Sequence, residues 1–336
     1  MNKTNNTNGF SFISYEYNIG PIILIKKVVG GFSTKNYTLK TENGGIFFLK
    51  EYSEEVNNIK FVEFSEGFFQ KAFPVIKPIL SRKNKKYIEY CSKKYVLYPY
   101  LNHVIKKTKN LNGEFAYNLG KFLAELHIYS KLNNDKYKNV RINKHSFDRD
   151  KTIVIFNKVL NVIKKSKKNI IFDRLAISLV KKRIKYILEK KDRKCVLDTN
   201  DYALLHGDYN HENVFFNKSG DIINIFDFEK TIIGSINYEI INTIIIVFFY
   251  GYRKQNFDRT EIFLNGYQNV RKIDRKEFKK CLSFFISELF YTTIFEEERY
   301  LNDNYRLSRV HIHYYNSLMY FSNNNCFIKK ILKMIN

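Results

Sequence analysis

The feature that most constrains this chain is a polar loop between apolar runs in its second half. Residues 206–213 read HGDYNHEN and follow a short apolar run at 202–205. Two further apolar runs within 214–226 flank a turn of Lys, Ser, Gly and Asp, a composition that predicts a β-hairpin. Directly after it, Asp227 stands between two phenylalanines. The pattern therefore predicts a strand, a polar loop, a hairpin and an anchored carboxylate, in that order.

The side chains of these segments form a set that phosphoryl transfer can use. That reaction needs a carboxylate beside an attacking hydroxyl, oxygen ligands for Mg²⁺ and a cation for the nucleotide phosphates. Asp208 follows an apolar strand, where a carboxylate can point into a cleft, and Asn213 lies far enough along the loop to return beside it. Asp227 follows after the predicted hairpin, with Phe226 and Phe228 to anchor it on both sides. Taken alone, residues 206–213 also fit an ordinary polar turn between strands.

The first third of the chain predicts an antiparallel sheet with one helix. Asn43-Gly44-Gly45 between two apolar runs is a hairpin signal, because Asn and Gly tolerate the positive φ of a tight turn. Apolar residues recur at near-helical spacing over 54–72. The predicted strands are 22–29, 37–40, 46–52, 87–89 and 95–98, with a turn at 91–94 between the last two.

The later part of the chain is predicted to be mainly helical. One amphipathic helix is expected over 114–129, and a second helical stretch, with Lys and Arg on its outer faces, over 151–190. From residue 236 onward, long segments with helical periodicity predict a bundle. Residues 1–20 read as a polar lead-in.

The change of character after Pro99 predicts two lobes. We expect an α+β fold in which residues 1–100 form a sheet-rich, nucleotide-binding lobe. Residues 101–336 form a larger, mainly helical lobe that carries the catalytic loop and the acceptor site. A cleft is expected at the link.

The HGDxxxxN form of the loop and the later Asp-Phe-Glu resemble the aminoglycoside phosphotransferases, the choline kinases and their relatives. The resemblance spans about residues 20–250 and implies a two-lobed, protein-kinase-like fold that uses ATP and Mg²⁺. It implies that Asp208 orients the acceptor hydroxyl and accepts its proton. It also implies that Asn213 and Asp227 bind the metal.

The same resemblance suggests roles for neighbouring residues. Glu229 matches an acidic position that many relatives carry near the metal, and Glu239 and His206 match structural supports of the loop. Many relatives have His-Pro where this chain has Asn210-His211, a departure that bears on the rigidity of the loop.

Lys50 is the expected cation for the nucleotide phosphates. It ends the run IFFLK after the predicted hairpin, although a solvent-facing strand lysine is the ordinary alternative in a chain this rich in Lys. By resemblance, a glutamate of the helix predicted over 54–72 should pair with it. Glu63 and Glu66 are the candidates, and Glu66 is preferred.

Two further segments complete the predicted nucleotide site. Gly31 and Ser33, within GGFST at 30–34, are the expected phosphate cover, since Gly permits close backbone approach and Ser can meet a phosphate oxygen. An ordinary β-turn explains this segment equally well. Tyr98 and Tyr100, within Tyr-Pro-Tyr-Leu, are the expected hinge, where backbone groups bond the adenine.

The predicted acceptor is a small hydroxyl compound of amino-alcohol, aminoglycoside or sugar type. Cationic acceptors call for acids and aromatics. Glu288 and Glu296–Glu298, among Phe290, Tyr291 and Phe295, are the best such cluster, although a solvated, charged helix face is the favoured interpretation of these acids.

Two other classes of protein compete with an enzyme. The first is a catalytically weak, kinase-fold binding or structural protein, because kinase-like spore-coat proteins share the pattern. The second is a nucleic-acid binder, motivated by the net charge of +24 and the basic residues of 164–194. Abundant Lys, Asn, Ile and Tyr without Trp is the drift of an AT-rich genome, so nucleic acid is not the expected partner.

The remaining composition points to a reduced, cytoplasmic setting. The four cysteines are scattered and form no zinc-like spacing. The start of the chain shows no signal peptide, and the most apolar stretch, 240–250, is too short to span a bilayer.

Overall fold

The structure is a computed structural model that describes most of the chain. The described residues are 10–28, 34–52, 59–101, 112–137, 142, 145–165, 171–190, 194–249, 256–305, 318, 320–321 and 325–335. Gly31 and Ser33, the predicted phosphate cover, lie outside the described residues.

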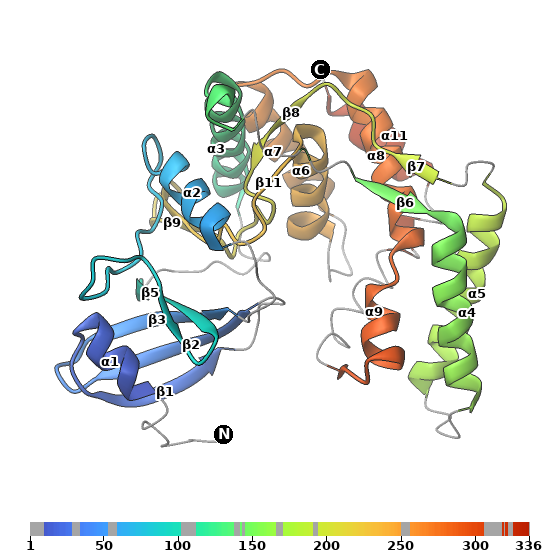
Figure 1. Ribbon diagram of the computed structural model, residues 1–336. Coiled ribbons are helices and arrows are strands. Elements are labelled where there is room, and N and C mark those ends of the chain that lie inside the picture. The colour runs from blue at the N-terminus through green and yellow to red at the C-terminus, as the bar shows by residue number, and fades with distance from the viewer. Residues whose placement is uncertain are drawn as a thin grey trace. The chain divides into compact units, whose positions relative to one another are not determined.

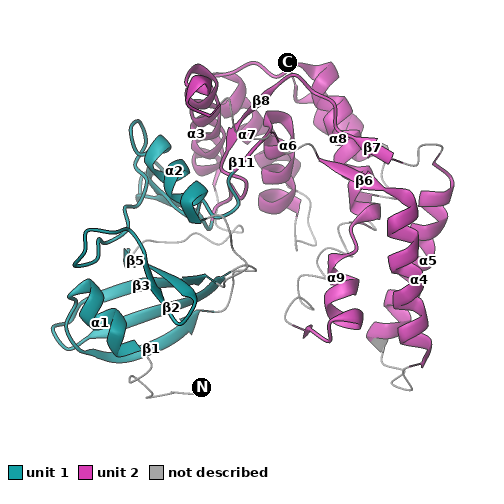
Figure 2. Cartoon of the chain, viewed as in Figure 1, with its two compact units in different colours: residues 1–105, 212–231 teal, residues 106–211, 232–336 magenta. Residues whose placement is uncertain are grey.

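The chain forms two compact units, and neither is continuous in sequence (Figure 2). Residues 1–105 and 212–231 form unit 1, and residues 106–211 and 232–336 form unit 2. The hairpin before Asp227 therefore folds with the N-terminal sheet.

Unit 1 is built on a five-stranded antiparallel sheet in the order β1-β2-β3-β5-β4 (Figure 1). The predicted turn between β2 and β3 is confirmed, with Gly44 at a φ of +83°. The turn between β4 and β5 is shorter than predicted and consists of Cys91 and Ser92, which both have positive φ. The strands are β1 (Ile22–Val28), β2 (Thr34–Thr41), β3 (Ile46–Tyr52), β4 (Ile88–Tyr90) and β5 (Lys93–Pro99).

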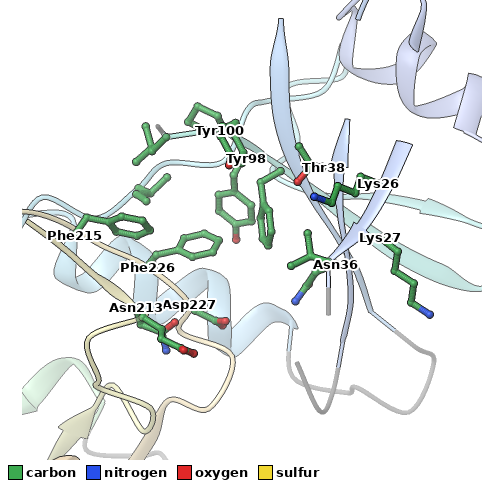
Figure 3. A pocket seen from close by; sticks show the side chains of 16 residues that line it. Lys26, Lys27, Asn36, Thr38, Tyr98, Tyr100, Asn213, Phe215, Phe226 and Asp227 are labelled. Carbon is green, nitrogen blue, oxygen red and sulfur yellow. The ribbon is translucent and has the colours of Figure 1, made fainter. Parts of the chain in front are cut away.

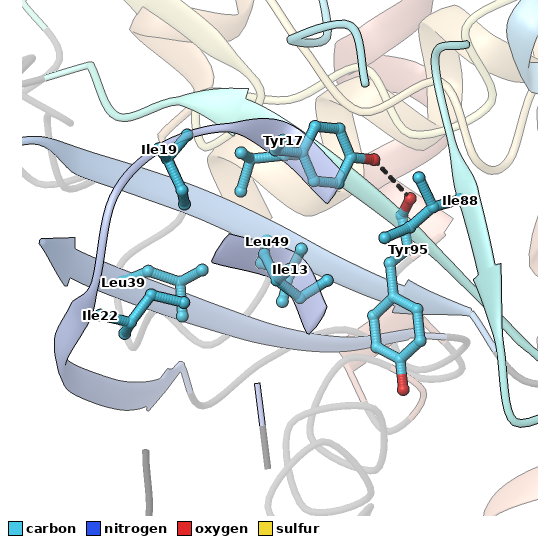
Figure 4. Close-up of a cluster of buried hydrophobic side chains, with 9 residues drawn as sticks. Ile13, Tyr17, Ile19, Ile22, Leu39, Leu49, Ile88 and Tyr95 are labelled. Atoms are coloured by element: carbon cyan, nitrogen blue, oxygen red, sulfur yellow. Dashed lines mark hydrogen bonds between the residues drawn. The ribbon is translucent and has the colours of Figure 1, made fainter. Parts of the chain in front are cut away.

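A short helix, α1 (Ser11–Tyr17), packs on the sheet (Figure 4). Ile13 and Tyr17 are buried against strand residues such as Leu39, Leu49 and Leu97, and the Tyr17 hydroxyl donates to the carbonyl of Tyr95 at 2.8 Å. The prediction of a polar lead-in over residues 1–20 was wrong here, because a two-turn helix shows too few apolar positions for its period to be visible.

A second apolar cluster of unit 1 joins α2 (Ile59–Phe69) to the sheet and to the β9–β10 hairpin (Val214–Phe216 and Ile222–Ile225). The helix predicted over 54–72 ends at Phe69, and residues 53–58 are not described. The hairpin is tied to the segment after α2, because Ile225 donates to the carbonyl of Pro74 at 3.0 Å.

Unit 2 is mainly helical, as predicted, with two small antiparallel strand pairs, β6–β7 and β8–β11. The helical stretch predicted over 151–190 is two helices. No helix in the described part of the chain combines the length and the apolar character that a bilayer span requires. The elements are α3 (Gly113–Leu132), β6 (Ser146–Asp148), α4 (Arg149–Lys165), α5 (Ile171–Leu188), β7 (Lys194–Val196), β8 (Tyr202–Leu205), β11 (Ile232–Ser235), α6 (Ile236–Ile244) with a π-helical continuation at Ile245–Phe249, α7 (Phe257–Gln268), α8 (Arg275–Tyr291), α9 (Ile294–Glu296) and α11 (Asn325–Lys333).

The helices α3 and α7 touch through their backbones. A Cβ atom on Gly120 would lie 2.0 Å from the carbonyl oxygen of Phe263, and one on Gly266 would lie 2.1 Å from that of Tyr117. Each helix thus contributes a glycine where the other passes, and α3 in turn packs on β8, the strand before the HGD loop.

Candidate active site

Lys50 lies on β3 with its ammonium group removed from water and beside two carboxylates. Its side chain is 2% exposed, and its Nζ lies 2.6 Å from Asp227 Oδ1 and 3.2 Å from Glu229 Oε2. Burial by itself would lower the pKa of Lys50, but Asp227, Tyr52 and Glu229 together raise it above its ordinary value. The ammonium therefore stays charged within unit 1.

Asp227 follows β10 in a strained backbone conformation between two anchored rings. Its φ of +70° lies in the left-handed region, which residues other than Gly adopt rarely. Phe226 packs edge-on against Tyr98 with ring centroids 4.8 Å apart, and Phe228 stacks on Phe69 at 5.5 Å. The two phenylalanines thus hold a turn that an isolated chain would not keep.

A cavity of about 560 Å³ opens beside Asp227 in unit 1 (Figure 3). This volume is typical of sites for small molecules. One side is apolar, and Asn213 lies beside Asp227 on the wall (Figure 3). The described wall comprises Val28, Phe48, Ile76, Tyr98, Pro99, Tyr100, Leu101, Phe215 and Phe226, with the polar residues Lys26, Lys27, Asn36, Thr38, Glu212, Asn213 and Asp227.

Four residues predicted from the sequence, Tyr98, Tyr100, Asn213 and Asp227, thus line one cavity, and their roles stay predictions. Other polar wall residues, such as Asn36, were not predicted as contacts. The alternation of β2 was the available signal, because Asn36 and Thr38 share one face of that strand.

The expected ion pair between Lys50 and a glutamate of α2 is absent among the described residues. Glu66 instead accepts a hydrogen bond from the Tyr98 hydroxyl at 2.8 Å. Burial raises the pKa of Glu66 to about 7, an effect that Tyr98 only partly opposes. The prediction differs from the structure because Asp227 and Glu229 are the acids that reach the ammonium.

Asn213 and Asp227 fit a Mg²⁺ site of the open kind. They supply an amide and a carboxylate oxygen on one cavity wall, and Mg²⁺ commonly takes few protein oxygens and completes its shell with phosphates and water. No group of three or more His, Cys, Asp or Glu that could hold a metal occurs in the described ranges. A metal at this position would therefore depend on a phosphate-bearing ligand.

The HGD loop belongs to unit 2 and is braced by its own side chains. Gly207, at a φ of +81°, turns the chain after β8, and the Asp208 N–H donates to His206 Nδ1 at 3.2 Å. The Asn210 amide donates to the Asp208 carbonyl at 2.9 Å and to its Oδ1 at 3.3 Å. Asn210 was not predicted to brace Asp208.

A network of hydrogen bonds between buried side chains in unit 2 reaches the backbone of this loop. The Gly207 N–H donates to Glu239 Oε1 at 2.5 Å, and Glu239 Oε2 lies 2.9 Å from His127 Nε2. His127 Nδ1 lies 2.8 Å from the Tyr267 hydroxyl, which also accepts from Arg271 at 3.3 Å. Since carboxylate oxygens accept, the simplest pattern has His127 Nε2 donating to Glu239, which leaves Nδ1 to accept from the Tyr267 hydroxyl.

The acidic cluster predicted for a cationic acceptor is partly structural. Glu296 is fully buried and accepts from Arg183 at 2.8 Å, so it is not free to meet a ligand. Glu288 keeps 21% of its side chain exposed, accepts from the Tyr238 hydroxyl at 2.6 Å and lies 3.8 Å from His145.

The chain belongs to the phosphotransferase enzyme family, whose model matches residues 24–271. This confirms the family resemblance carried by the HGD loop and the Asp-Phe-Glu segment. No curated protein shows a significant match to the sequence.

Solved structures share the fold at low sequence identity. A spectinomycin phosphotransferase in complex with ADP and spectinomycin has a TM-score of 0.64 at 18% identity, with 98% of each chain covered. An amicoumacin kinase with AMP-PNP and Ca²⁺ has a TM-score of 0.58 at 15% identity, covering 85% of this chain and 84% of that chain. A macrolide 2′-phosphotransferase from Brachybacterium faecium has a TM-score of 0.51 at 10% identity, with 98% of each chain covered. The chain therefore has the fold of kinase-like phosphotransferases.

Proposed function

We propose that this chain is an ATP- and Mg²⁺-dependent phosphotransferase that moves the γ-phosphate to a hydroxyl group of a small molecule. The observation that carries the proposal is the meeting of Lys50, Asp227 and Asn213 in unit 1, with the latter two on the wall of one cavity. A buried cation beside oxygen ligands is the arrangement that nucleotide phosphates require.

Each residue has a role in this proposal. Lys50 would bind the α- and β-phosphates, and Asn213 and Asp227 would hold Mg²⁺. When bound, the metal would supply positive charge that neutralises the phosphate oxygens. Asp208 would accept the proton of the attacking hydroxyl while the new oxygen–phosphorus bond forms and ADP leaves with the electrons of the broken bond.

The hinge edge of β5 supports adenine as the base. The Tyr100 N–H donates to Ile46 of β3 at 3.3 Å, whereas the Leu97 carbonyl accepts from Ile79 on the opposite edge at 2.7 Å. Backbone groups of alternate residues in a strand point to the same edge, so the Pro99 carbonyl points, like that of Leu97, to the edge of β5 that faces away from β3. Because proline has no N–H, this position offers an acceptor alone, which suits the exocyclic amine of adenine better than the carbonyl of guanine.

We infer that the acceptor is of amino-alcohol, aminoglycoside or sugar type. The support is membership of the phosphotransferase family and a fold shared with enzymes whose names specify spectinomycin and macrolides. Glu288, Glu297 and Glu298 are the acids of the predicted cluster that stay partly accessible for a cationic acceptor.

The first experiment measures the affinity of the wild type for ATP and GTP with and without Mg²⁺. We expect ATP to bind more tightly than GTP and Mg²⁺ to strengthen binding. Asp227→Ala should lose most of the metal effect. Nucleotide binding that never depends on the metal would contradict the proposal.

The second experiment follows ADP release over a panel of amino-alcohols, aminoglycosides and sugars, with Asp208→Ala as the blank. Release above the blank for one acceptor class identifies the substrate type. Tight nucleotide binding with no acceptor-dependent release would instead favour the catalytically weak, structural protein.

A further inference from the structure

Two carboxylates share the ammonium group of Lys50, and they differ in exposure. The Asp227 side chain is 19% exposed and lines the cavity, while that of Glu229 is 5% exposed and is not part of the described wall. The cavity-facing acid is therefore the one that a ligand can reach. The other acid contacts Lys50 from within the protein.

Glu229 is itself held in place. The Thr34 hydroxyl, on β2, lies 3.2 Å from the Glu229 Oε2 atom that contacts Lys50, and Thr34 is 3% exposed. The same hydroxyl lies 3.2 Å from Asn36 Oδ1, so its single proton is shared between these two acceptors. Oε2 thus has one donor from β2 and one from β3.

The glutamate of α2 that was expected to pair with Lys50 has another partner in the structure. Glu66 accepts from Tyr98, and the carboxylates that lie within ion-pair distance of Lys50 among the described residues are Asp227 and Glu229. Lys50 must therefore be oriented by an acid outside α2.

We propose that Glu229, fixed by Thr34, is the positioning residue that orients Lys50 toward the nucleotide phosphates, in place of a glutamate of α2. The inference rests on the proposed function. An ammonium group has three donors, so Lys50 can keep Glu229 as a partner while another donor meets a phosphate. Asp227 is then left for the metal, and Glu229 does not ligate it.

The experiment measures ATP affinity with and without Mg²⁺ in Glu229→Gln, Glu66→Gln and Asp227→Asn. Without metal, Glu229→Gln should weaken ATP about tenfold, the size of one charge-assisted hydrogen bond. The strengthening that Mg²⁺ gives should stay as large as in the wild type. Asp227→Asn should lose that strengthening.

A matched control and a second variant complete the design. Glu51→Gln also removes a buried acid of unit 1 that pairs with a lysine, Lys93 at 2.9 Å, but at a position that does not line the cavity, so ATP affinity should not change. Thr34→Val should reproduce part of the Glu229→Gln loss, and it replaces that variant if Glu229→Gln does not fold. Loss of the Mg²⁺ effect in Glu229→Gln would make Glu229 a metal ligand and overturn the proposal.

A readout without nucleotide separates this inference from the proposed function. In a double-mutant cycle of urea unfolding, Lys50→Met and Glu229→Gln should be non-additive, whereas Lys50→Met and Glu66→Gln should add. Coupling to Glu66 rather than Glu229 overturns the inference even if the protein is a kinase. Coupling of Lys50 to Glu229 without any ATP binding would support the Lys50–Glu229 interaction and contradict the proposed phosphotransferase function.

Discussion

Glu66 is a carboxylate that lies almost wholly out of water. It is 3% exposed, and the Tyr98 hydroxyl donates to it at 2.8 Å. Burial raises its pKa from the ordinary 4.5 to about 7, because the charged form loses its hydration; Tyr98, Lys86 and Lys50 oppose this effect without cancelling it. The protonation state of one side chain behind the cavity thus changes within the physiological range.

We predict that Glu66 makes the protein less stable as the pH rises from about 4.5 to about 7. In this window folded Glu66 keeps a proton that the unfolded chain has already lost, so the free energy of unfolding falls with pH. The loss should be on the order of 2 to 3 kcal/mol across the window. Urea unfolding at several pH values should show this slope in the wild type and a flatter one in Glu66→Gln. Equal slopes in the two proteins would refute the buried, protonated carboxylate.

Sequence reasoning at the residue scale succeeded where the signal was local. Asn213 and Asp227 were predicted as metal ligands from the family resemblance of two local motifs; both line one cavity, and metal binding stays a prediction. The partner of Lys50 was not predictable in this way. Several acids can reach a given lysine in the folded chain, and the choice between Glu66 and Glu229 depends on burial and on Thr34, which lies far away in sequence.

At the scale of elements, the backbone contact of α3 with α7 leaves no room for side chains. Gly120 and Gly266 face carbonyl oxygens at distances that a Cβ atom cannot occupy. The same two helices carry His127 and Tyr267, members of the network below the HGD loop. A change in helix spacing would therefore reach the loop that holds Asp208.

We predict that Gly120→Ala destabilises the protein by about 3 kcal/mol or more, because the clash is with backbone that cannot rotate away. Gly67→Ala is the matched control, since Gly67 is also helical and a Cβ there would meet nothing nearer than Lys86 Nζ at 3.9 Å. That variant should be about 0.5–1 kcal/mol more stable than the wild type, as the helix propensity of Ala implies. Thermal and urea unfolding of both variants test the pair. A loss of stability in Gly67→Ala equal to that in Gly120→Ala would argue against close packing of the helices.

The elements that were predicted from the sequence are long or lie beside a recognisable turn. The elements that were missed are short and lack such a turn. The β2–β3 hairpin was predicted because Asn43-Gly44 is a local turn signal, and α3 because its apolar face repeats over about three turns. The strands β6, β7 and β11 were missed because they are three or four residues long and, unlike β4, β9 and β10, have no recognised hairpin turn beside them. Their pairing is decided by distant partners, as with β11 and β8.

At the scale of the whole molecule, the chain passes between the two units three times. It forms unit 1, continues into unit 2 at residue 106, returns to unit 1 over 212–231 and then completes unit 2. The returning segment, 212–231, is an integral part of unit 1, because it contacts the rest of the unit through both backbone and side chains. Ile225 exchanges backbone hydrogen bonds with the segment after α2, and Phe228 stacks on Phe69 of that helix. Asp227 and Glu229 also neutralise the buried Lys50. The fold of the first hundred residues therefore depends on a segment that follows more than a hundred residues later in the sequence.

We predict that residues 1–105 alone do not fold cooperatively, whereas the same residues joined to 212–231 by a long Gly/Ser linker do. Without the returning segment, Lys50 would lose both acids that neutralise it, and Phe69 and Tyr98 would lose their ring contacts with Phe228 and Phe226. Circular dichroism during urea unfolding should show a sigmoidal transition for the joined chain and none for the fragment. Lys50→Met should recover part of the cooperativity of the fragment, because it removes the uncompensated charge. In the joined chain, Asp227→Asn with Glu229→Gln should weaken the transition for the converse reason. A fragment that unfolds as sharply as the joined chain would show that the sheet and α2 suffice, and that the later hairpin serves the cavity alone.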